Sequence, residues 1–304
     1  MSAKSLLHRE RIGVGMCEHD DLDEFARRAH ELTRRQFGAM AFGASVIAAL
    51  PTAADAAETE AADVEVKTAD GTADAYFVHP AKGKHPGVLI WPDIFGLRPA
   101  FKDMATRLAE SGYSVLVINP FYRTKKAPTA PEHPDFNDPP TRDALMALAG
   151  SLTPVTAVTD AKAFVAFLDR QHSVDKSKQI GTTGYCMGGP FVLRTAATFP
   201  DRVGAGATFH GGGLVTDKPD SPHLLIPKMK AHFLIAIAEN DDKKQPEAKD
   251  VLRDSFAKAQ LPAEIEVYAG TMHGWCPPDS QVYNHDQSEK AWSRLLVLFG
   301  SSLA

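Results

Sequence analysis

The stretch Gly184-Tyr185-Cys186-Met187-Gly188 decides the fold. Residues 179–183 before it are typical of a β-strand, and residues 187–199 after it are typical of a helix. Such a sharp turn strains its central residue and lifts that side chain above the sheet, and glycines flank it because strand and helix approach too closely for a β-carbon. The pattern predicts a nucleophile elbow in which the thiol of Cys186 replaces the usual serine. The alternative is a tight turn around a buried cysteine, since free cysteine is among the most buried residue types.

The first part of the chain predicts an export signal. Thr33-Arg34-Arg35-Gln36-Phe37 precedes a mostly apolar stretch, residues 37–50, and small residues then end in Ala54-Asp55-Ala56. A pair of arginines, a short apolar segment and Ala-x-Ala in this order are typical of the twin-arginine route. The apolar stretch is shorter than the roughly 20 residues that span a bilayer. We therefore expect a periplasmic or secreted location after twin-arginine export, with an ordinary short helix as the alternative.

The signal sets the predicted domain boundaries. Residues 1–56 form the leader, residues 57–63 a polar linker, and residues 64–304 the folded domain. The segment before the arginines is long and acidic, which leaves open a long leader or a translation start downstream, at Met16 for example.

Composition narrows the class of protein. About 240 residues after the leader suit a single α/β domain, and a hydrophobic content of 44% is enough for a large core. The net charge is −5 without a basic cluster, so we expect no nucleic-acid partner and no membrane in the mature form. We also expect a monomer. Of three cysteines, Cys17 lies in the leader, and we expect Cys186 and Cys276 to stay unpaired because a disulfide would consume the nucleophile.

Strand-like and helix-like runs alternate along the domain. A strand pair with a turn at Asp70-Gly71 leads, and a proline-rich loop lies between Arg123 and Pro140. The predicted strands are 64–67, 73–79, 87–91, 114–119, 179–183, 205–210, 232–238 and 265–268, and the predicted helices are 100–111, 155–170, 187–199, 247–259 and 285–299. This alternation predicts an α/β fold with a mainly parallel central sheet and helices on both faces, whose chemistry gathers at the carboxyl ends of the strands. Together with the elbow, it indicates the α/β-hydrolase fold.

Two further residues complete a candidate triad. A thiol needs a base, and the base needs an orienting partner; in this fold the acid and then the histidine follow the nucleophile along the chain. Asp241 follows strand 232–238 and His273 follows strand 265–268. We therefore predict Cys186, Asp241 and His273 as the triad. The alternatives are Asp241 or Asp242 as a helix N-cap, and His273 as a solvated loop residue.

Two backbone amides are predicted to form an oxyanion hole. In this fold one donor is the amide after the nucleophile, which is Met187, and the other comes from the loop after an early strand. Ile94 in Pro92-Asp93-Ile94-Phe95-Gly96 is the natural second donor. His210-Gly211-Gly212-Gly213 matches an oxyanion string of lipases, but it comes after the nucleophile, so we interpret it as a turn that follows a strand. Motifs for zinc, phosphate and dinucleotides are absent and the histidines are scattered, so we expect neither metal nor cofactor.

With Asp93-Ile94-Phe95-Gly96-Leu97, Gly181 to Gly189, Glu239-Asn240-Asp241 and His273-Gly274-Trp275, the chain resembles the dienelactone hydrolases (carboxymethylenebutenolidases) from Val64 to Leu298. The resemblance implies hydrolysis of esters or lactones through a Cys-Asp-His triad without metal or cofactor.

The chain departs from that family pattern at two places. Asp93 stands where the family carries a glutamate that modulates the thiol, and no arginine follows His273 to hold a substrate carboxylate. Arg123 or Arg142 is a substitute, and a less anionic substrate is the alternative. Aromatic residues form either a substrate pocket or plain core, namely Trp91, Phe95, Phe121, Tyr122 and Trp275.

We therefore predict a hydrolase that cleaves activated carboxylic esters or enol-lactones, with a small-molecule ester or lactone as its partner. The alternatives are a general thiol esterase, thioesterase or peptidase on the same fold, and a non-catalytic binding protein that keeps the fold.

Overall fold

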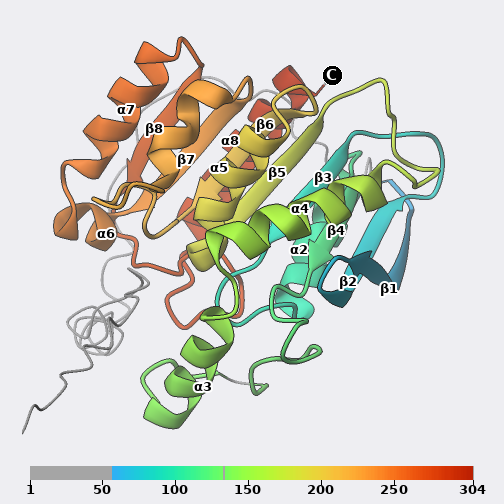
Figure 1. The fold of residues 1–304 in the computed structure, drawn as a ribbon, viewed down its shortest axis with the longest axis horizontal. Helices are drawn as coiled ribbons and strands as arrows, with labels where there is room; N and C mark the ends of the chain where they lie inside the picture. The colour runs from blue at the N-terminus through green and yellow to red at the C-terminus, as the bar shows by residue number, and fades with distance from the viewer. Residues whose placement is uncertain (1–56, 133, 304) are drawn as a thin grey trace, which may run out of the picture.

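The fold is that of a computed structural model, which describes residues 57–132 and 134–303 (Figure 1). The predicted export signal and Cys17 lie outside the described residues, so the export route and the location stay predictions.

A single eight-stranded sheet forms the centre of the domain, in the order β1-β2-β4-β3-β5-β6-β7-β8. The strands are β1 (Thr59–Thr68), β2 (Gly71–Pro80), β3 (Gly87–Trp91), β4 (Ser114–Ile118), β5 (Ile180–Tyr185), β6 (Val203–Phe209), β7 (His232–Ala238) and β8 (Ala263–Tyr268). The pairs β1–β2 and β2–β4 are antiparallel, and β4, β3, β5, β6, β7 and β8 run parallel. The predicted mainly parallel sheet is confirmed.

Helices cover both faces of this sheet. They are α2 (Pro99–Glu110), α3 (Pro139–Ala149), α4 (Pro154–Leu168), α5 (Gly189–Thr198), α6 (Glu239–Lys244), α7 (Ala248–Lys258) and α8 (His285–Ser302), with 3-10 turns η1 (Cys186–Gly188) and η2 (Pro222–Lys228). In Figure 1, α4, α5 and α7 lie in front of the sheet, and α2 and α8 lie behind it.

Two hydrophobic cores follow from this three-layer arrangement. Leu89 and Trp91 of β3 pack in the core with α4 and α5, whereas Val88 and Ile90 pack in the core with α2 and α8. All five residues of β3 are buried, because successive side chains point to opposite faces and both faces are covered. This is why the strand is a continuous apolar run in the sequence.

The predicted linker, residues 57–63, is wrong in part. Strand β1 begins at Thr59, where Thr59 pairs with Pro80, and five of the predicted linker residues therefore belong to the sheet. This stretch lies on the edge of the sheet and is largely exposed, so it carries no apolar alternation that would predict a strand.

Helix α3 was not predicted. Pro139 and Pro140 suggested the end of a loop, but they stand in the first turn of α3, where a missing N–H costs nothing. Asp138 caps the helix by accepting the Thr141 N–H at 3.0 Å. The short elements α6 and η2 were not predicted either, because a stretch of six or seven residues carries too little periodicity.

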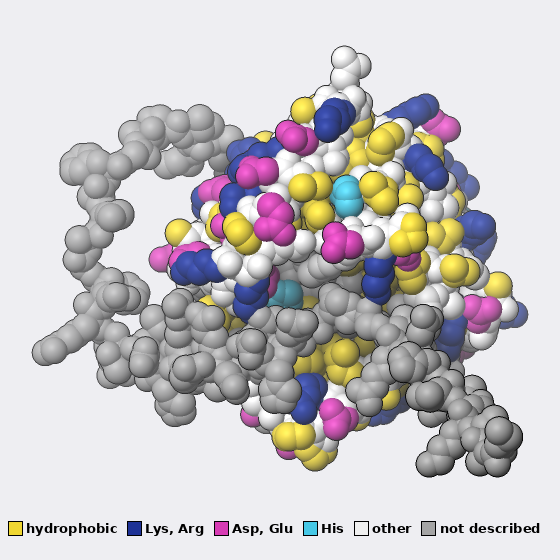
Figure 2. Space-filling model, turned by 60° about the vertical axis from the view of Figure 1, so that its left-hand side comes forward, with side chains coloured by type: hydrophobic (Ala, Val, Ile, Leu, Met, Phe, Trp, Pro, Cys, Tyr) yellow, Lys and Arg dark blue, Asp and Glu magenta, His cyan; other side chains and the backbone are white. Residues whose placement is uncertain are grey.

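The surface does not concentrate one sign of charge on the face shown in Figure 2, where acidic and basic side chains alternate. Among the described helices, no single one is long and apolar enough to cross a membrane; α3 and α4 pass this test only as a pair, bent by 71°.

Candidate active site

Cys186 occupies a strained turn between β5 and α5. Its φ angle is +50°, in the left-handed region that a residue other than glycine rarely adopts. A β-carbon on Gly184 would lie 2.4 Å from the Gly188 carbonyl oxygen, and one on Gly188 would lie 2.2 Å from the Trp91 carbonyl oxygen. The two glycines therefore let strand, helix and the end of β3 approach one another, and the backbone at Cys186 has the geometry of the predicted elbow.

His273 and Asp241 meet at the carboxyl ends of the neighbouring strands β7 and β8. The Nδ1 atom of His273 lies 2.7 Å from Oδ2 of Asp241, and the side chains are 19% and 25% exposed. Asn240 also holds this loop, since its Oδ1 accepts the His273 backbone N–H at 2.8 Å. Asp242 instead pairs with Lys249, at 2.6 Å. Of the two candidate acids, the structure therefore brings Asp241 to the histidine.

The Nε2 side of His273 faces the thiol. Burial lowers the pKa of His273, but the charges of Asp241 and Cys186, with hydrogen bonds to both side chains, outweigh it and raise this pKa well above 6.5. Apart from Cys186, Nε2 has no hydrogen-bond partner within residues 57–132 and 134–303. The side chain of Cys186 is mostly buried, with the residue 8% exposed. The imidazole is thus held on one side and left free on the side of the sulfur.

The two predicted oxyanion donors lie on segments that touch. Met187 follows Cys186 in η1, and Ile94 lies in the turn after β3. Glycine at position 188 lets these segments come close, because a β-carbon there would lie 2.2 Å from the Trp91 carbonyl oxygen and 2.8 Å from the Pro92 carbonyl oxygen. Both predicted donors belong to buried residues.

The Asp93 carboxylate is bound by Arg98. It forms two hydrogen bonds with Arg98, at 2.6 and 2.9 Å, and accepts the Phe95 N–H at 2.9 Å. The effect of Asp93 on the thiol stays a prediction. The Phe95 ring lies beside Phe136, with ring centroids 6.3 Å apart.

Tyr122 and Arg123 belong to a network of polar side chains around Asp160. Arg123 binds Asp160 of α4 through two hydrogen bonds of 2.7 Å, and it also pairs with Asp70 at the β1–β2 turn. The Tyr122 hydroxyl donates to Asp160 at 2.7 Å and contacts Thr68. The guanidinium of Arg123 is therefore engaged by two carboxylates of the protein, and its role toward a substrate carboxylate stays a prediction.

Trp275 is part of the core. It is fully buried and stacks on Tyr268 with ring centroids 4.8 Å apart. It therefore supports the loop that carries His273 and does not wall the pocket at Cys186.

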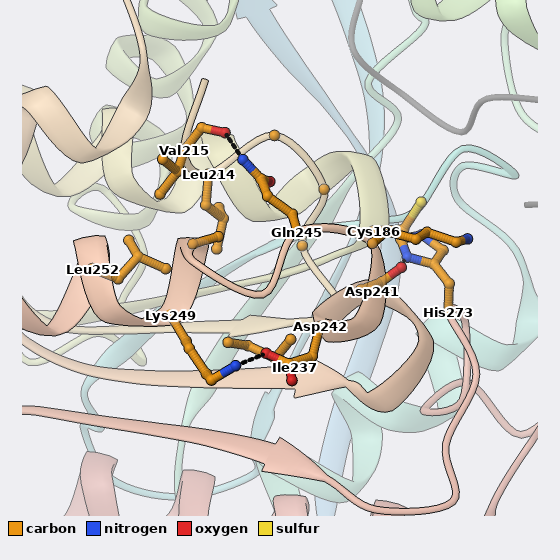
Figure 3. A pocket seen from close by; sticks show the side chains of 15 residues that line it. Cys186, Leu214, Val215, Ile237, Asp241, Asp242, Gln245, Lys249, Leu252 and His273 are labelled. Carbon is orange, nitrogen blue, oxygen red and sulfur yellow. Dashed lines mark hydrogen bonds and ion pairs between the residues drawn. The ribbon is translucent and has the colours of Figure 1, made fainter. Parts of the chain in front are cut away.

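A cavity of about 180 Å³ opens beside Cys186 (Figure 3). Asp241 and His273 line it near the thiol. The remaining lining mixes apolar side chains with polar and charged ones, namely Leu214, Val215, Ile237, Leu252, Asp242, Lys244, Gln245 and Lys249. Gln245 closes one wall by donating to the Val215 carbonyl oxygen at 3.2 Å, as Figure 3 shows.

Residues 211–215 line the pocket although the sequence did not predict it, and the same holds for Ile237, Lys244, Gln245, Ala248, Lys249 and Leu252. The glycine string after His210 forms a turn, as predicted, but Gly211, Gly212 and Gly213 also line the cavity. A β-carbon on Gly189 would lie 2.7 Å from the Gly211 α-carbon, so the loop comes close to the helix that follows the elbow. The glycine string was the available signal for this approach.

The ring of His210 lies next to the ring of the candidate base, His273. Its ring centroid is 5.2 Å from that of His273, at an interplanar angle of 72°, and both ring nitrogens lack a hydrogen-bond partner among the described residues. Burial, together with the nearby charge of His273, lowers the pKa of His210 well below 6.5. The surroundings of His210 therefore favour its uncharged form.

The two described cysteines are unpaired, as predicted. Cys276 is buried in the core with α8, and burial raises the pKa of its thiol well above its usual value. Residues 57–132 and 134–303 contain no group of three or more His, Cys, Asp or Glu side chains able to hold a metal ion.

Comparison with known proteins agrees with this geometry. A model described as the dienelactone hydrolase family matches residues 73–303. The carboxymethylenebutenolidase of Rhodococcus opacus is 28% identical over 235 residues, which cover 75% of this chain and 87% of that relative.

Solved structures show the same fold. A dienelactone hydrolase-like promiscuous phosphotriesterase from metagenomic libraries has a TM-score of 0.67 at 20% identity, covering 81% of this chain and 99% of the other. The dienelactone hydrolase of Anabaena variabilis has a TM-score of 0.57 at 16% identity, covering 81% of this chain and 99% of the other.

The sheet, the turn at Cys186 and these structural neighbours define an α/β-hydrolase, which confirms the predicted fold. Within that class, the chain belongs to the dienelactone hydrolase family. It is a hydrolase that acts on esters or lactones.

Proposed function

We propose that this enzyme cleaves activated esters or enol-lactones with Cys186 as nucleophile, His273 as base and Asp241 as orienting acid. The observation that carries the proposal is the position of His273. Its Nδ1 is bound to Asp241 at 2.7 Å, while its Nε2 is free of other described partners and lies on the side of the thiol. This is the arrangement in which an imidazole can accept a proton on one nitrogen while the other is held.

The reaction follows from these positions. The Cys186 proton passes to Nε2 of His273, and the sulfur bonds to the carbonyl carbon, whose oxygen becomes an oxyanion. The amides of Ile94 and Met187 donate hydrogen bonds to that oxygen. The oxyanion re-forms the carbonyl, the leaving group departs with the proton from His273, and water then releases the acid from the thioester by the same steps.

The thiol favours substrates with good leaving groups. The tetrahedral intermediate expels the weaker base more readily, and a thiolate, with a pKa near 8.5 as the free amino acid, is a weaker base than an alkoxide or an amine. Enolates and phenolates leave more easily than alkoxides, so enol-lactones and aryl esters suit this site better than peptides. The name of the Rhodococcus opacus relative supports an enol-lactone.

The test is a substrate panel on the wild type, Cys186→Ala and Cys276→Ala. The panel contains a dienelactone, nitrophenyl esters, thioesters and peptides. Cys186→Ala is expected to lose at least about a thousandfold in kcat/KM, as is typical when a covalent nucleophile is removed. Cys276→Ala serves as the matched control, because Cys276 packs in the core with α8.

Two outcomes would contradict the proposal. Activity retained by Cys186→Ala would exclude the thiol as nucleophile. A wild type that turns over no activated ester, and whose Cys186 does not react with iodoacetamide, would favour a binding protein instead.

A further inference from the structure

One guanidinium joins two loops of the candidate active site. Arg98 precedes α2 and binds the Asp93 carboxylate through Nη1 and Nη2, at 2.6 and 2.9 Å. The same side chain binds Asp279 through Nε at 2.6 Å and through Nη2 at 3.0 Å. Only 10% of the Arg98 side chain is exposed.

The first carboxylate belongs to the turn that carries the candidate oxyanion donor. Asp93 immediately precedes Ile94, and its Oδ1 also accepts the Phe95 N–H at 2.9 Å. The Asp93 carbonyl oxygen accepts the Gly96 N–H at 3.0 Å, which closes the turn. Through Asp93, Arg98 therefore holds the backbone on both sides of the Ile94 amide.

The second carboxylate belongs to the segment that follows the candidate base. Asp279 lies between His273 and α8, and it is separated from Arg98 by 181 residues along the chain. Its side chain is 39% exposed, so this end of the bridge is near the surface. The bridge thus connects the turn after β3 to the loop after β8, and these two segments carry the oxyanion donor and the imidazole.

Arginine is the residue type that can do this. Its five N–H groups lie in one rigid plane, so it can bind two carboxylates at fixed angles, whereas the single ammonium of lysine acts as a point charge. Burial disfavours the charged guanidinium, but Asp93 and Asp279 outweigh that effect and raise the pKa of Arg98 above its usual value. The rings of Phe95 and Phe101 pack against the guanidinium, with centroids 5.4 and 4.8 Å away.

We propose that Arg98 is a positioning residue, which fixes the Ile94 amide in the oxyanion hole by tying its turn to the loop after His273. Asp93 then acts through this tether. The proposal rests on the function proposed above, because it needs Ile94 as an oxyanion donor.

The experiment compares Arg98→Gln and Arg98→Lys with Arg107→Gln. Arg107 is a matched control on the same helix, because it also binds one carboxylate, that of Glu289, through two hydrogen bonds of 2.7 and 2.6 Å, but at an exposed position toward α8. For each variant, kcat and KM are measured on p-nitrophenyl acetate, and the rate of Cys186 alkylation by iodoacetamide is measured separately. Alkylation forms no oxyanion, so it reports the thiol alone.

Arg98→Gln is expected to lower kcat by about 10- to 100-fold, less than the loss of a whole oxyanion donor. Its KM should stay within about threefold, and its alkylation rate should not change. Arg98→Lys should lose nearly as much, because the charge remains but the planar bridge does not. Arg107→Gln should match the wild type in all three measurements.

The proposal is overturned if Arg98→Gln keeps the wild-type kcat, if Arg107→Gln loses as much, or if alkylation slows in parallel with kcat. Should Arg98→Gln fail to fold, Asp279→Asn removes only the outer tether and must lower kcat, by about three- to tenfold, without changing alkylation. Cys186→Ala separates the two proposals: an active Cys186→Ala refutes the function, whereas an inactive Cys186→Ala beside a fully active Arg98→Gln refutes the tether alone.

Discussion

Replacing Asp241 by asparagine removes the charge that faces His273 while keeping the shape of the side chain. The Nδ1–Oδ2 distance of 2.7 Å and the low exposure of both side chains describe a charge-assisted hydrogen bond that water screens only in part. Such a bond contributes about 1.5–3 kcal/mol to the protonated imidazole. Since each 1.36 kcal/mol is tenfold in rate, Asp241→Asn should lower kcat/KM by about 10- to 150-fold.

The same substitution should also shift the pH dependence of kcat/KM in a definite direction. Asp241 raises the pKa of His273 because the carboxylate stabilises the imidazolium. Without that charge the pKa of His273 must fall, so the neutral imidazole that accepts the Cys186 proton persists to lower pH. The acid limb of kcat/KM against pH should therefore move to lower pH in Asp241→Asn.

The assay is initial-rate hydrolysis of p-nitrophenyl acetate between about pH 5 and 10. Asp242→Asn is the matched control, because the neighbouring Asp242 pairs with Lys249 and not with His273. Its rate and its pH profile should stay near those of the wild type. The reasoning is refuted if Asp241→Asn keeps its rate within about twofold, if its acid limb does not move, or if Asp242→Asn is affected as much.

Three further predictions concern stability. Gly188→Ala places a β-carbon 2.2 Å from the Trp91 carbonyl oxygen and should lower the free energy of unfolding in urea by more than about 3 kcal/mol. Gly212→Ala, whose β-carbon meets no atom within 4 Å, should lower it by less than about 1 kcal/mol. Similar losses in the two variants would contradict the packing at the elbow. Arg123→Met removes the cation that pairs with the buried carboxylate of Asp160 and should lower the free energy of unfolding by about 3–5 kcal/mol. Its kcat should not change. A large loss of kcat would instead indicate that Arg123 acts in the active site. Burial lowers the pKa of His210 below 6.5 in the folded protein. Below pH 6.5 the unfolded chain therefore binds a proton at His210 that the folded protein does not bind. Stability is lost as the pH falls, by up to about 1.4 kcal/mol per pH unit. His210→Phe should remove this loss from a series of unfolding curves between pH 7 and 5, and an unchanged slope would show that another group causes it.

The order of strands and helices could be predicted from the sequence, because most elements show a local pattern of apolar and polar residues. Strand β3 is five apolar residues in a row, and β7 was predicted with the bounds it has in the structure. Strand β1 could not be placed fully, since an exposed edge strand needs no apolar face. Helix α3 was missed because its prolines also suit a loop.

The candidate triad could be located from the sequence for a topological reason. In a parallel sheet the carboxyl ends of all strands meet at one edge, so residues just after β5, β7 and β8 are brought together whatever the details of packing. Cys186, Asp241 and His273 are such residues. The glycines of the elbow add a local signal, because a β-carbon at either position would clash.

The partner of each polar side chain was decided only by the tertiary structure. Asp241 and Asp242 are neighbours in the sequence, yet one binds His273 and the other Lys249. Asp93 was expected to act on the thiol and is bound by Arg98, which in turn reaches Asp279 far along the chain. Hydrogen bonds and ion pairs act over about 3 Å, so they depend on how loops from distant strands come to rest against each other, and no local pattern in the sequence records that.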